Sequence, residues 1–146
     1  MRIGQVAALS GIEAATIRFY EQQGLLPAAP RQANHYRDYS AQDVHRLRLI
    51  RLCRSMDMSL EEVKALLALD GASAQDCRAA SDTVQAHLGH VRARIQELQE
   101  LERTLAHLLA QCQGPQTACG LLAALHAQAD APHSMDAAAA PTKRHV

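Results

Sequence analysis

The longest regular pattern in the chain is a heptad repeat of mostly apolar positions between Asp76 and Cys112. One row of positions recurs every seven residues, and a second row fills the alternating steps of four and three residues. The rows are Cys77, Val84, Val91, Leu98, Leu105 and Cys112, and Ser81, Leu88, Ile95, Glu102 and Leu109. This spacing predicts one long helix whose seam pairs with a second helix. A chain of 146 residues is too short to bury that seam by itself, so the pattern predicts a homodimer.

The two cysteines of the seam cannot meet within one chain. Cys77 and Cys112 are 35 residues apart, which is about 52 Å along a helix that rises about 1.5 Å per residue. Antiparallel pairing of two helices would bring Cys77 of one protomer near the partner's Cys112. Cys119 follows after a loop in which Gly114-Pro115 ends the helix. The pattern therefore predicts three thiols that only a dimer assembles.

Shorter patterns precede the long helix. Apolar positions in residues 3–7 predict a short helix that is broken at Ser10-Gly11, and a second helix is expected from about Glu13 to Gln23, ended by Gly24. Helix, tight turn and helix form a helix-turn-helix pattern. The alternating residues 36–39 then predict a short strand, which would form a β-hairpin wing beside the second helix.

Three Ser-x-x-acid sequences predict further helix starts. Ser40 opens a helix through about Ser55, Ser59 opens one through Leu69, and Ser73 opens the long helix. The first of these has an apolar face that includes Cys53, so this cysteine is expected in the core. Leu121, Leu122 and Leu125 predict a short last helix, and the Ala- and Pro-rich tail predicts disorder.

A formal net charge of zero hides an uneven distribution of charge. The first 56 residues hold eight arginines against four acids, a net charge of +4, and they also hold all four aromatic residues of the chain. A compact basic N-terminal module is implied. No segment has the 18 apolar residues of a membrane span, and the start has no apolar export signal. We therefore expect a cytoplasmic protein without a membrane partner, in which cysteines are metal ligands, redox thiols or buried residues rather than disulfides.

Several of these segments together resemble the MerR family of metal-responsive transcription regulators. The resemblance rests on residues 16–21 (TIRFYE), residues 24–27 (GLLP), Arg31, residues 36–39 (YRDY) and residues 47–67. The placement of Cys77, Cys112 and Cys119 is most similar to the cadmium- and lead-responsive branch, and the resemblance covers about residues 1–127. Two departures are Glu13, where Ser or Thr is the more usual helix cap, and Asn34-His35, where the wing turn commonly has Gly.

The resemblance implies a homodimer on a palindromic operator in double-stranded promoter DNA, acting on RNA polymerase at that promoter. It also implies repression in the metal-free state and activation of resistance or efflux genes when bound metal untwists the DNA. The expected fold is mainly α. It has a winged helix-turn-helix domain (1–70), an antiparallel dimerisation helix (73–112), a metal-binding loop with a short helix (112–127) and a disordered tail (128–146).

The expected DNA contacts lie on the second helix and the wing. Arg18 is the strongest candidate, because a guanidinium can bridge phosphates or read guanine edges. The full set is Thr16, Arg18, Tyr20, Arg31, Tyr36, Arg37 and Tyr39. The alternatives are that Tyr20 belongs to the core and that the wing residues only pack on the helices. Phosphate contacts carry little sequence information, so the operator sequence cannot be read from them.

Cys77, supplied by the partner protomer, together with Cys112 and Cys119 forms the candidate metal site. Three thiolates carry a charge of about −3 and suit a soft divalent ion, so Cd(II) and Pb(II) lead. Hg(II) is a further candidate, and Zn(II), which prefers four ligands, would leave one coordination place open. Relatives that sense monovalent ions typically have Ser where Cys77 stands.

His87 and His90 lie three residues apart and therefore on one face of the long helix. With a carboxylate such as Glu62 they would suit a second, borderline divalent ion, aided by the tail residues His133 and His145. The alternative is that both are solvated surface histidines.

Two other classes of function remain open. One is a thiol-oxidation sensor with a Cys112–Cys119 disulfide, which would respond to peroxide without metal. The other is a structural, zinc-linked coiled-coil dimer, which the basic N-terminal module argues against. No catalytic constellation is present, so the chain is not expected to be an enzyme.

Overall fold

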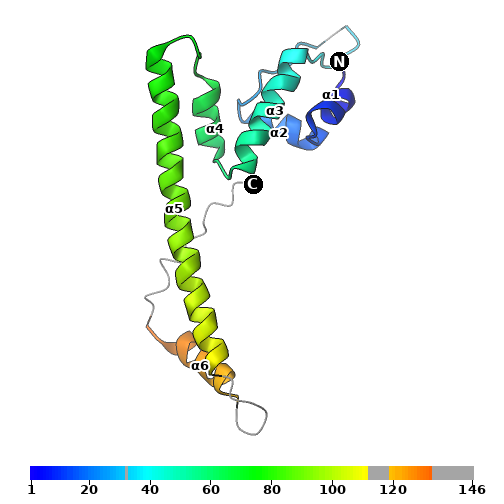
Figure 1. Cartoon of the computed structure of the whole chain (residues 1–146). Coiled ribbons are helices and arrows are strands. Elements are labelled where there is room, and N and C mark those ends of the chain that lie inside the picture. The colour runs from blue at the N-terminus through cyan, green and yellow to red at the C-terminus, as the bar shows by residue number, and fades with distance from the viewer. Residues whose placement is uncertain (32, 112–118, 133–146) are drawn as a thin grey trace. The chain divides into compact units, whose positions relative to one another are not determined.

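The computed structural model describes residues 1–31, 33–111 and 119–132, and these ranges form six α-helices (Figure 1). The helices are α1 (Ile3–Ser10), α2 (Ala14–Gln22), α3 (Ala41–Ser55), α4 (Leu60–Leu67), α5 (Ala74–Ala110) and α6 (Gly120–Asp130). The predicted mainly α fold, with an N-terminal helix-turn-helix followed by one long helix, is confirmed. The described residues form two compact units, one of Met1–His87 and one that starts at Leu88.

The turn between α1 and α2 depends on Gly11. This residue has φ 72°, a left-handed conformation that favours glycine, and its amide donates to the carbonyl of Ala7 at 2.9 Å. The buried hydroxyl of Ser10 accepts a bond from the amide of Ile12 at 3.3 Å. At the start of α2, Glu13 makes no side-chain cap bond, as expected from its residue type.

The wing is a loop rather than the predicted β-hairpin. Within the described part of this loop the pairing is a single antiparallel bridge between Arg31 and Arg37. Pro27 and Pro30 lack the amide hydrogens that a longer ladder needs. In the Asn34-His35 turn, His35 takes the left-handed conformation that Gly commonly provides, with φ 65°. The Asn34 side chain accepts a bond from the amide of Tyr36 at 3.2 Å.

Two of the three predicted capping boxes are complete. The hydroxyl groups of Ser40 and Ser59 accept bonds from the amides of Asp43 and Glu62, whose carboxylates bond back to the cap amides. The third box is incomplete. Although the Ser73 hydroxyl accepts bonds from the next helical amides, the Asp76 carboxylate accepts from the amide of Asp70 at 2.6 Å.

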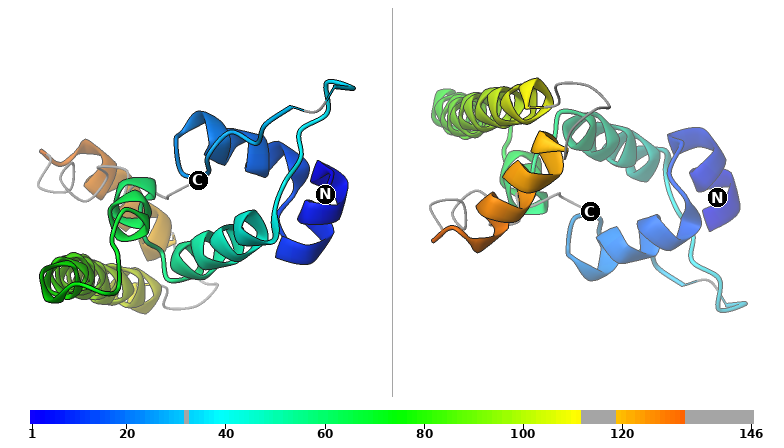
Figure 2. Two further views of the ribbon diagram at one scale, coloured as in Figure 1. Left: turned by 90° about the horizontal axis from the view of Figure 1, so that it is seen from above. Right: turned by 90° about the horizontal axis from the view of Figure 1, so that it is seen from below.

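The core of the first unit lies among α1, α2, α3 and α4, whose packing Figure 2 shows from above and below. Its fully buried side chains include Val6, Ile17, Leu25, Leu26, Leu47, Ile50 and Val63. Cys53 is also buried here, as predicted, and burial raises the pKa of its thiol.

The apolar seam of α5 is exposed in the single chain. Val84, Leu88, Val91, Ile95, Leu98, Leu105 and Leu109 are between 36% and 67% exposed. Leu108, off the seam, is buried. Among the described helices, no segment combines the length and the hydropathy that a membrane span requires.

The start of α6 lies against the end of α5. A Cβ atom on Gly120 would come within 2.4 Å of the carbonyl oxygen of Gln111. Glycine at this position therefore permits a backbone approach that a larger residue would block.

Candidate DNA interface and metal site

Helix α2 presents Arg18 to solvent because its other face is held in the core. Ile17 and Tyr20 are 0% and 8% exposed, so the helix can rotate little about its axis. Arg18 is exposed between them, and Thr16 is half-buried. Of the three residues predicted on this helix, Arg18 is thus the most accessible, and Tyr20 belongs to the core.

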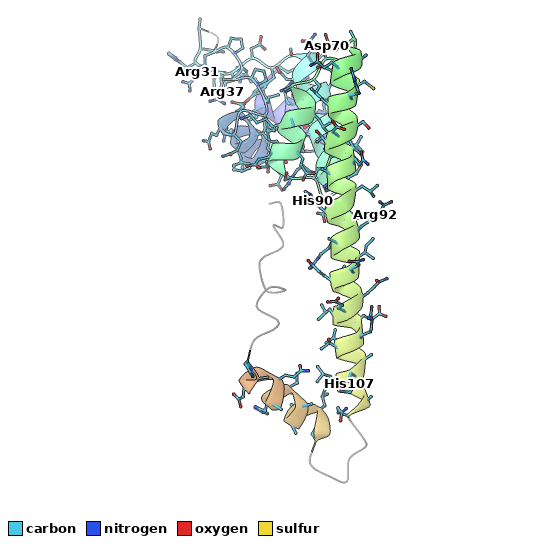
Figure 3. All side chains as sticks on the ribbon, turned by 90° about the vertical axis from the view of Figure 1, so that its left-hand side faces the viewer. Arg31, Arg37, Asp70, His90, Arg92 and His107 are labelled. Atoms are coloured by element: carbon cyan, nitrogen blue, oxygen red, sulfur yellow. The ribbon has the colours of Figure 1, made fainter. Side chains whose placement is uncertain are left out.

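The wing places two further arginines beside α2. Arg31 and Arg37 are the two residues that the bridge pairs, and both lie in the wing (Figure 3). Tyr36, between them in sequence, is 56% exposed, and the guanidinium carbon of Arg2 lies 4.4 Å from the centre of its ring. This cation–π contact links the start of α1 to the wing.

A buried carboxylate on α2 holds the wing from beneath. The Glu21 side chain is only 4% exposed and forms an ion pair with Arg37, whose side chain is 34% exposed. The other Glu21 oxygen accepts a hydrogen bond from the hydroxyl of Tyr39. Tyr39 is itself buried, so its hydroxyl group faces Glu21 instead of solvent.

The N-terminus fixes the far end of the same loop. The amino group of Met1 donates to the Asp38 carboxylate at 2.8 Å and to the carbonyl of Tyr39 at 2.9 Å. The amide of Tyr39 donates back to the carbonyl of Met1 at 2.8 Å. The loop is therefore anchored both to the N-terminal residue that precedes α1 and to α2.

Five of the seven predicted DNA contacts line one groove between the helices and the wing. These are Arg18, Arg31, Tyr36, Arg37 and Tyr39, and the groove also contains Arg2 and Glu21. Four guanidinium groups along one groove suit the phosphate backbone of a nucleic acid.

Sequence reasoning missed Arg2 and Glu21 as parts of this groove. A signal for Glu21 was available, because it lies four residues after the core residue Ile17 and so on the same face of the helix. An acid on a buried helix face needs a positive partner. Arg2 had no comparable signal, because its partner Tyr36 is distant in sequence.

The described cysteines fall into two environments. Cys77 in the first turn of α5 and Cys119 at the N-cap of α6 are free and exposed, whereas Cys53 is free and buried. Cys112, the remaining thiol of the predicted site, lies outside the described residues. The tail residues His133 and His145 also lie outside them.

The predicted second site includes a close pair of potential ligands. Nδ1 of His87 lies 2.8 Å from a carboxylate oxygen of Glu62, and Nε2 lies 2.8 Å from the carbonyl oxygen of Met56. His87 is 9% exposed, so it is not a solvated surface histidine. His90 is exposed and follows His87 by about one helical turn of α5 (Figure 3).

Comparison with known proteins identifies the class of this chain. Residues 1–70 match the model of the MerR HTH family regulatory proteins, and residues 44–108 match the model described as MerR, DNA binding. The HTH-type transcriptional regulator HmrR of Sinorhizobium medicae (strain WSM419) is 41% identical over 118 residues, 78% of this chain and 78% of the relative. The chain belongs to the MerR family. It is a DNA-binding transcription regulator and not an enzyme.

Two further similarities concern regulators associated with metals by name. Heavy metal-dependent transcription regulator 2 of Rhizobium meliloti (strain 1021) is 40% identical over 118 residues, again 78% of each chain. The crystal structure of the transcription regulator PbrR691 from Ralstonia metallidurans CH34 in complex with lead(II) has a TM-score of 0.72 and 36% identity. The match covers 86% of this chain and 98% of that one.

Proposed function

We propose that this MerR-family protein is a metal-sensing regulator that binds a palindromic promoter operator as a homodimer. The metal-free dimer represses, and the dimer with Cd(II) or Pb(II) activates resistance or efflux genes by distorting the DNA for RNA polymerase. The protein acts in the cytoplasm. The heavy-metal-dependent relative and the lead(II) complex of PbrR691 support a metal effector.

The exposed seam of α5 supports the dimer. A row of Val, Ile and Leu side chains on one helix, each at least 36% exposed, needs a partner surface. A second α5 in antiparallel orientation supplies one with the same spacing. In this proposal residues 1–70 bind DNA, residues 73–112 dimerise and residues 112–127 hold metal. Of the predicted tail (128–146), residues 128–130 belong to α6, and residues 133–146 lie outside the described residues.

The different exposure of the cysteines is the observation that carries the metal assignment. Cys77 and Cys119 are exposed, so an incoming ion can reach both thiols, while the cysteine assigned to the core is buried. We assign Cys77 of one protomer with the partner's Cys112 and Cys119. Thiolates favour soft ions, so Cd(II) and Pb(II) fit this donor set, and Hg(II) and Zn(II) are competitors to be tested beside them.

DNA distortion accounts for activation without release from the operator. Bending or untwisting DNA costs free energy, which protein–DNA contacts offset. The arginine groove must therefore stay bound to the operator in both the metal-free and the metal-bound state. An effector that simply released the protein would only relieve repression.

One sample can test metal and DNA together. The full-length protein is titrated with Cd(II) while thiolate-to-metal absorption is recorded, and the same sample is footprinted on operator DNA. The expected result is absorption that saturates together with a changed cleavage pattern at the centre of a retained footprint. Saturation without any change at the DNA, or an equal change with peroxide in metal-free medium, would contradict the proposal.

We also propose a second, weaker metal site at Glu62, His87 and His90. The contact between Glu62 and His87 supports it, because a carboxylate and an imidazole already meet there. His90 adds a second imidazole on the same face of α5. These are ligands of borderline divalent ions.

The test of the second site is stoichiometry. The His87→Ala, His90→Ala double variant should bind fewer Cd(II) ions per dimer than the wild type, with unchanged thiolate absorption. A matched control is the His45→Ala, His107→Ala double variant, which removes two exposed histidines elsewhere. Equal stoichiometry in all three proteins would remove this site.

A further inference from the structure

The groove between α2 and the wing contains one acid among four arginines. A carboxylate facing DNA phosphates would oppose binding by simple charge repulsion. Glu21 does not face outward, however, because its side chain is only 4% exposed and lies beneath Arg37.

Arg37 has two sides that meet different surroundings. Its Nη1 atom pairs with the buried Glu21 carboxylate, while about a third of the side chain remains exposed in the groove. A guanidinium has five N–H donors in a planar fork, so it can bind a carboxylate on one side and a phosphate oxygen on the other. An arginine fixed in this way loses less side-chain freedom when it contacts DNA.

Glu21 also fixes the position of the wing relative to α2. The Tyr39 hydroxyl bonds to the same carboxylate, so two wing residues meet one acid on the helix that carries Arg18. Arg18 and Glu21 are three residues apart on α2, which sets a constant distance between the base of the wing and Arg18.

We infer that Glu21 is a positioning residue for operator binding, which holds Arg37 in the geometry for a phosphate contact. Glu21 itself does not touch DNA. The inference rests on the proposed contact between Arg37 and a DNA phosphate. It adds that the strength of this contact depends on the buried carboxylate of Glu21.

The sign of the effect separates positioning from simple charge. Removing an acid near DNA makes the protein more positive, which by itself strengthens binding. Positioning predicts the opposite, namely that Glu21→Gln weakens operator binding about three- to tenfold, because a neutral amide holds Arg37 less firmly. The matched control is Glu13→Gln, which removes the same charge from the exposed N-cap residue of α2. The Glu13 side chain makes no cap bond.

The experiment measures operator affinity at several salt concentrations for the full-length wild type, Glu21→Gln, Arg37→Ala and the double variant. Each lost phosphate contact reduces the slope of log affinity against log salt by about 0.9. Glu21→Gln and Arg37→Ala should both reduce the slope, and in the Arg37→Ala background Glu21→Gln should cause no further weakening of binding.

Three outcomes are informative. A normal slope and affinity for Arg37→Ala would overturn the proposed phosphate contact and, with it, the inference. If Arg37→Ala reduces the affinity and the slope as expected but Glu21→Gln changes them no more than Glu13→Gln does, the positioning role alone is overturned. An equal loss from Glu21→Gln with and without Arg37 would show that Glu21 acts only on the fold.

Folding of the variants is checked by thermal melting. Glu21→Gln keeps the size of the side chain and an oxygen that can accept the Tyr39 hydrogen bond. If this variant does not fold, Glu21→Asp, which keeps the charge, goes through the same cycle. It should show the same dependence on Arg37 with a smaller loss of affinity, and a loss independent of Arg37 would again overturn the inference.

Discussion

The hydroxyl of Tyr39 donates a hydrogen bond to the carboxylate of Glu21 and so joins the wing to α2. Burial raises the pKa of Tyr39 above its usual value of 10.0. The nearby guanidinium groups of Arg37 and Arg18 lower the pKa, but their effect is smaller than that of burial. The folded state therefore favours the neutral phenol, which is the form that can donate to Glu21.

This shift predicts a loss of stability in alkali. The contribution of Tyr39 is complete below its unfolded pKa of about 10 and is lost as the pH rises through the higher folded value. In denaturant titrations, the free energy of unfolding of the wild type should fall more steeply above about pH 10 than that of Tyr39→Phe. Tyr36→Phe, which changes an exposed tyrosine of the same loop, should follow the wild type. Parallel curves for wild type and Tyr39→Phe would contradict the prediction.

The metal site predicts different effects for two cysteine substitutions. Cys77→Ser should leave a dimer that binds operator DNA but no longer activates transcription with Cd(II) or Pb(II), because a hydroxyl is a poor ligand for soft ions. Cys53→Ala, at a buried thiol, should lower stability and retain the metal response. Promoter assays with purified polymerase measure the metal response of both variants, and urea unfolding measures the stability of Cys53→Ala. Full activation by Cys77→Ser would exclude the three-thiol site.

The seam of α5 predicts that one charge can break the dimer. Leu98→Glu places a carboxylate at a heptad position that needs an apolar partner, so the sedimentation equilibrium should shift towards monomer. Gln99→Glu adds the same charge at the next, exposed position and should stay dimeric. If both variants sediment alike, the seam is not the interface.

The cap of α3 contributes a measurable part of the stability. Ser40→Ala removes the acceptor for the amide of Asp43, at 3.2 Å, and should lower the free energy of unfolding by about 1 kcal/mol. Glu13→Ala, at a cap position without a side-chain bond, should cost clearly less. Urea unfolding of the two variants gives the comparison, and an equal cost would show that the box does not act as a cap.

The close backbone approach at Gly120 predicts local loosening in a larger variant. Gly120→Ala places a methyl group against the carbonyl of Gln111, which should cost about 1 to 3 kcal/mol of local stability. Hydrogen exchange should speed up in α6, while the amides of α3 remain protected. Gly71→Ala is the control, since an added Cβ atom there has open space.

Much of the helical structure could be predicted because its signals are local. Heptad spacing, serine caps and Gly24 each depend on a few neighbouring residues, and the predicted ends of α1 to α5 lie within about two residues of those observed, whereas α6 extends to Asp130, beyond its predicted end. The conformation of the wing was harder to predict, because it depends on contacts between residues that are distant in sequence. Tyr39 meets Glu21 and Met1, and no pattern within residues 36–39 contains that information.

The candidate sites divide in the same way. Arg18, Arg31 and Arg37 could be predicted as a group, because a charged residue type in a helix-turn-helix context suggests its own role. The burial of His87 could not be predicted, because the heptad pattern shows only that this residue does not belong to the seam. Its burial follows from Glu62 and the carbonyl of Met56, which come from α4 and the end of α3.

Every residue of the hydrophobic cluster, including its partly buried members, lies between Met1 and Leu67. The first unit can therefore complete its core before the ribosome has released α5. Domains generally fold as units during synthesis, the N-terminal one first. We expect nascent chains to hold a folded DNA-binding module while the seam of α5 still awaits its partner. Assembly into dimers would then be a separate, concentration-dependent step in the life of the regulator.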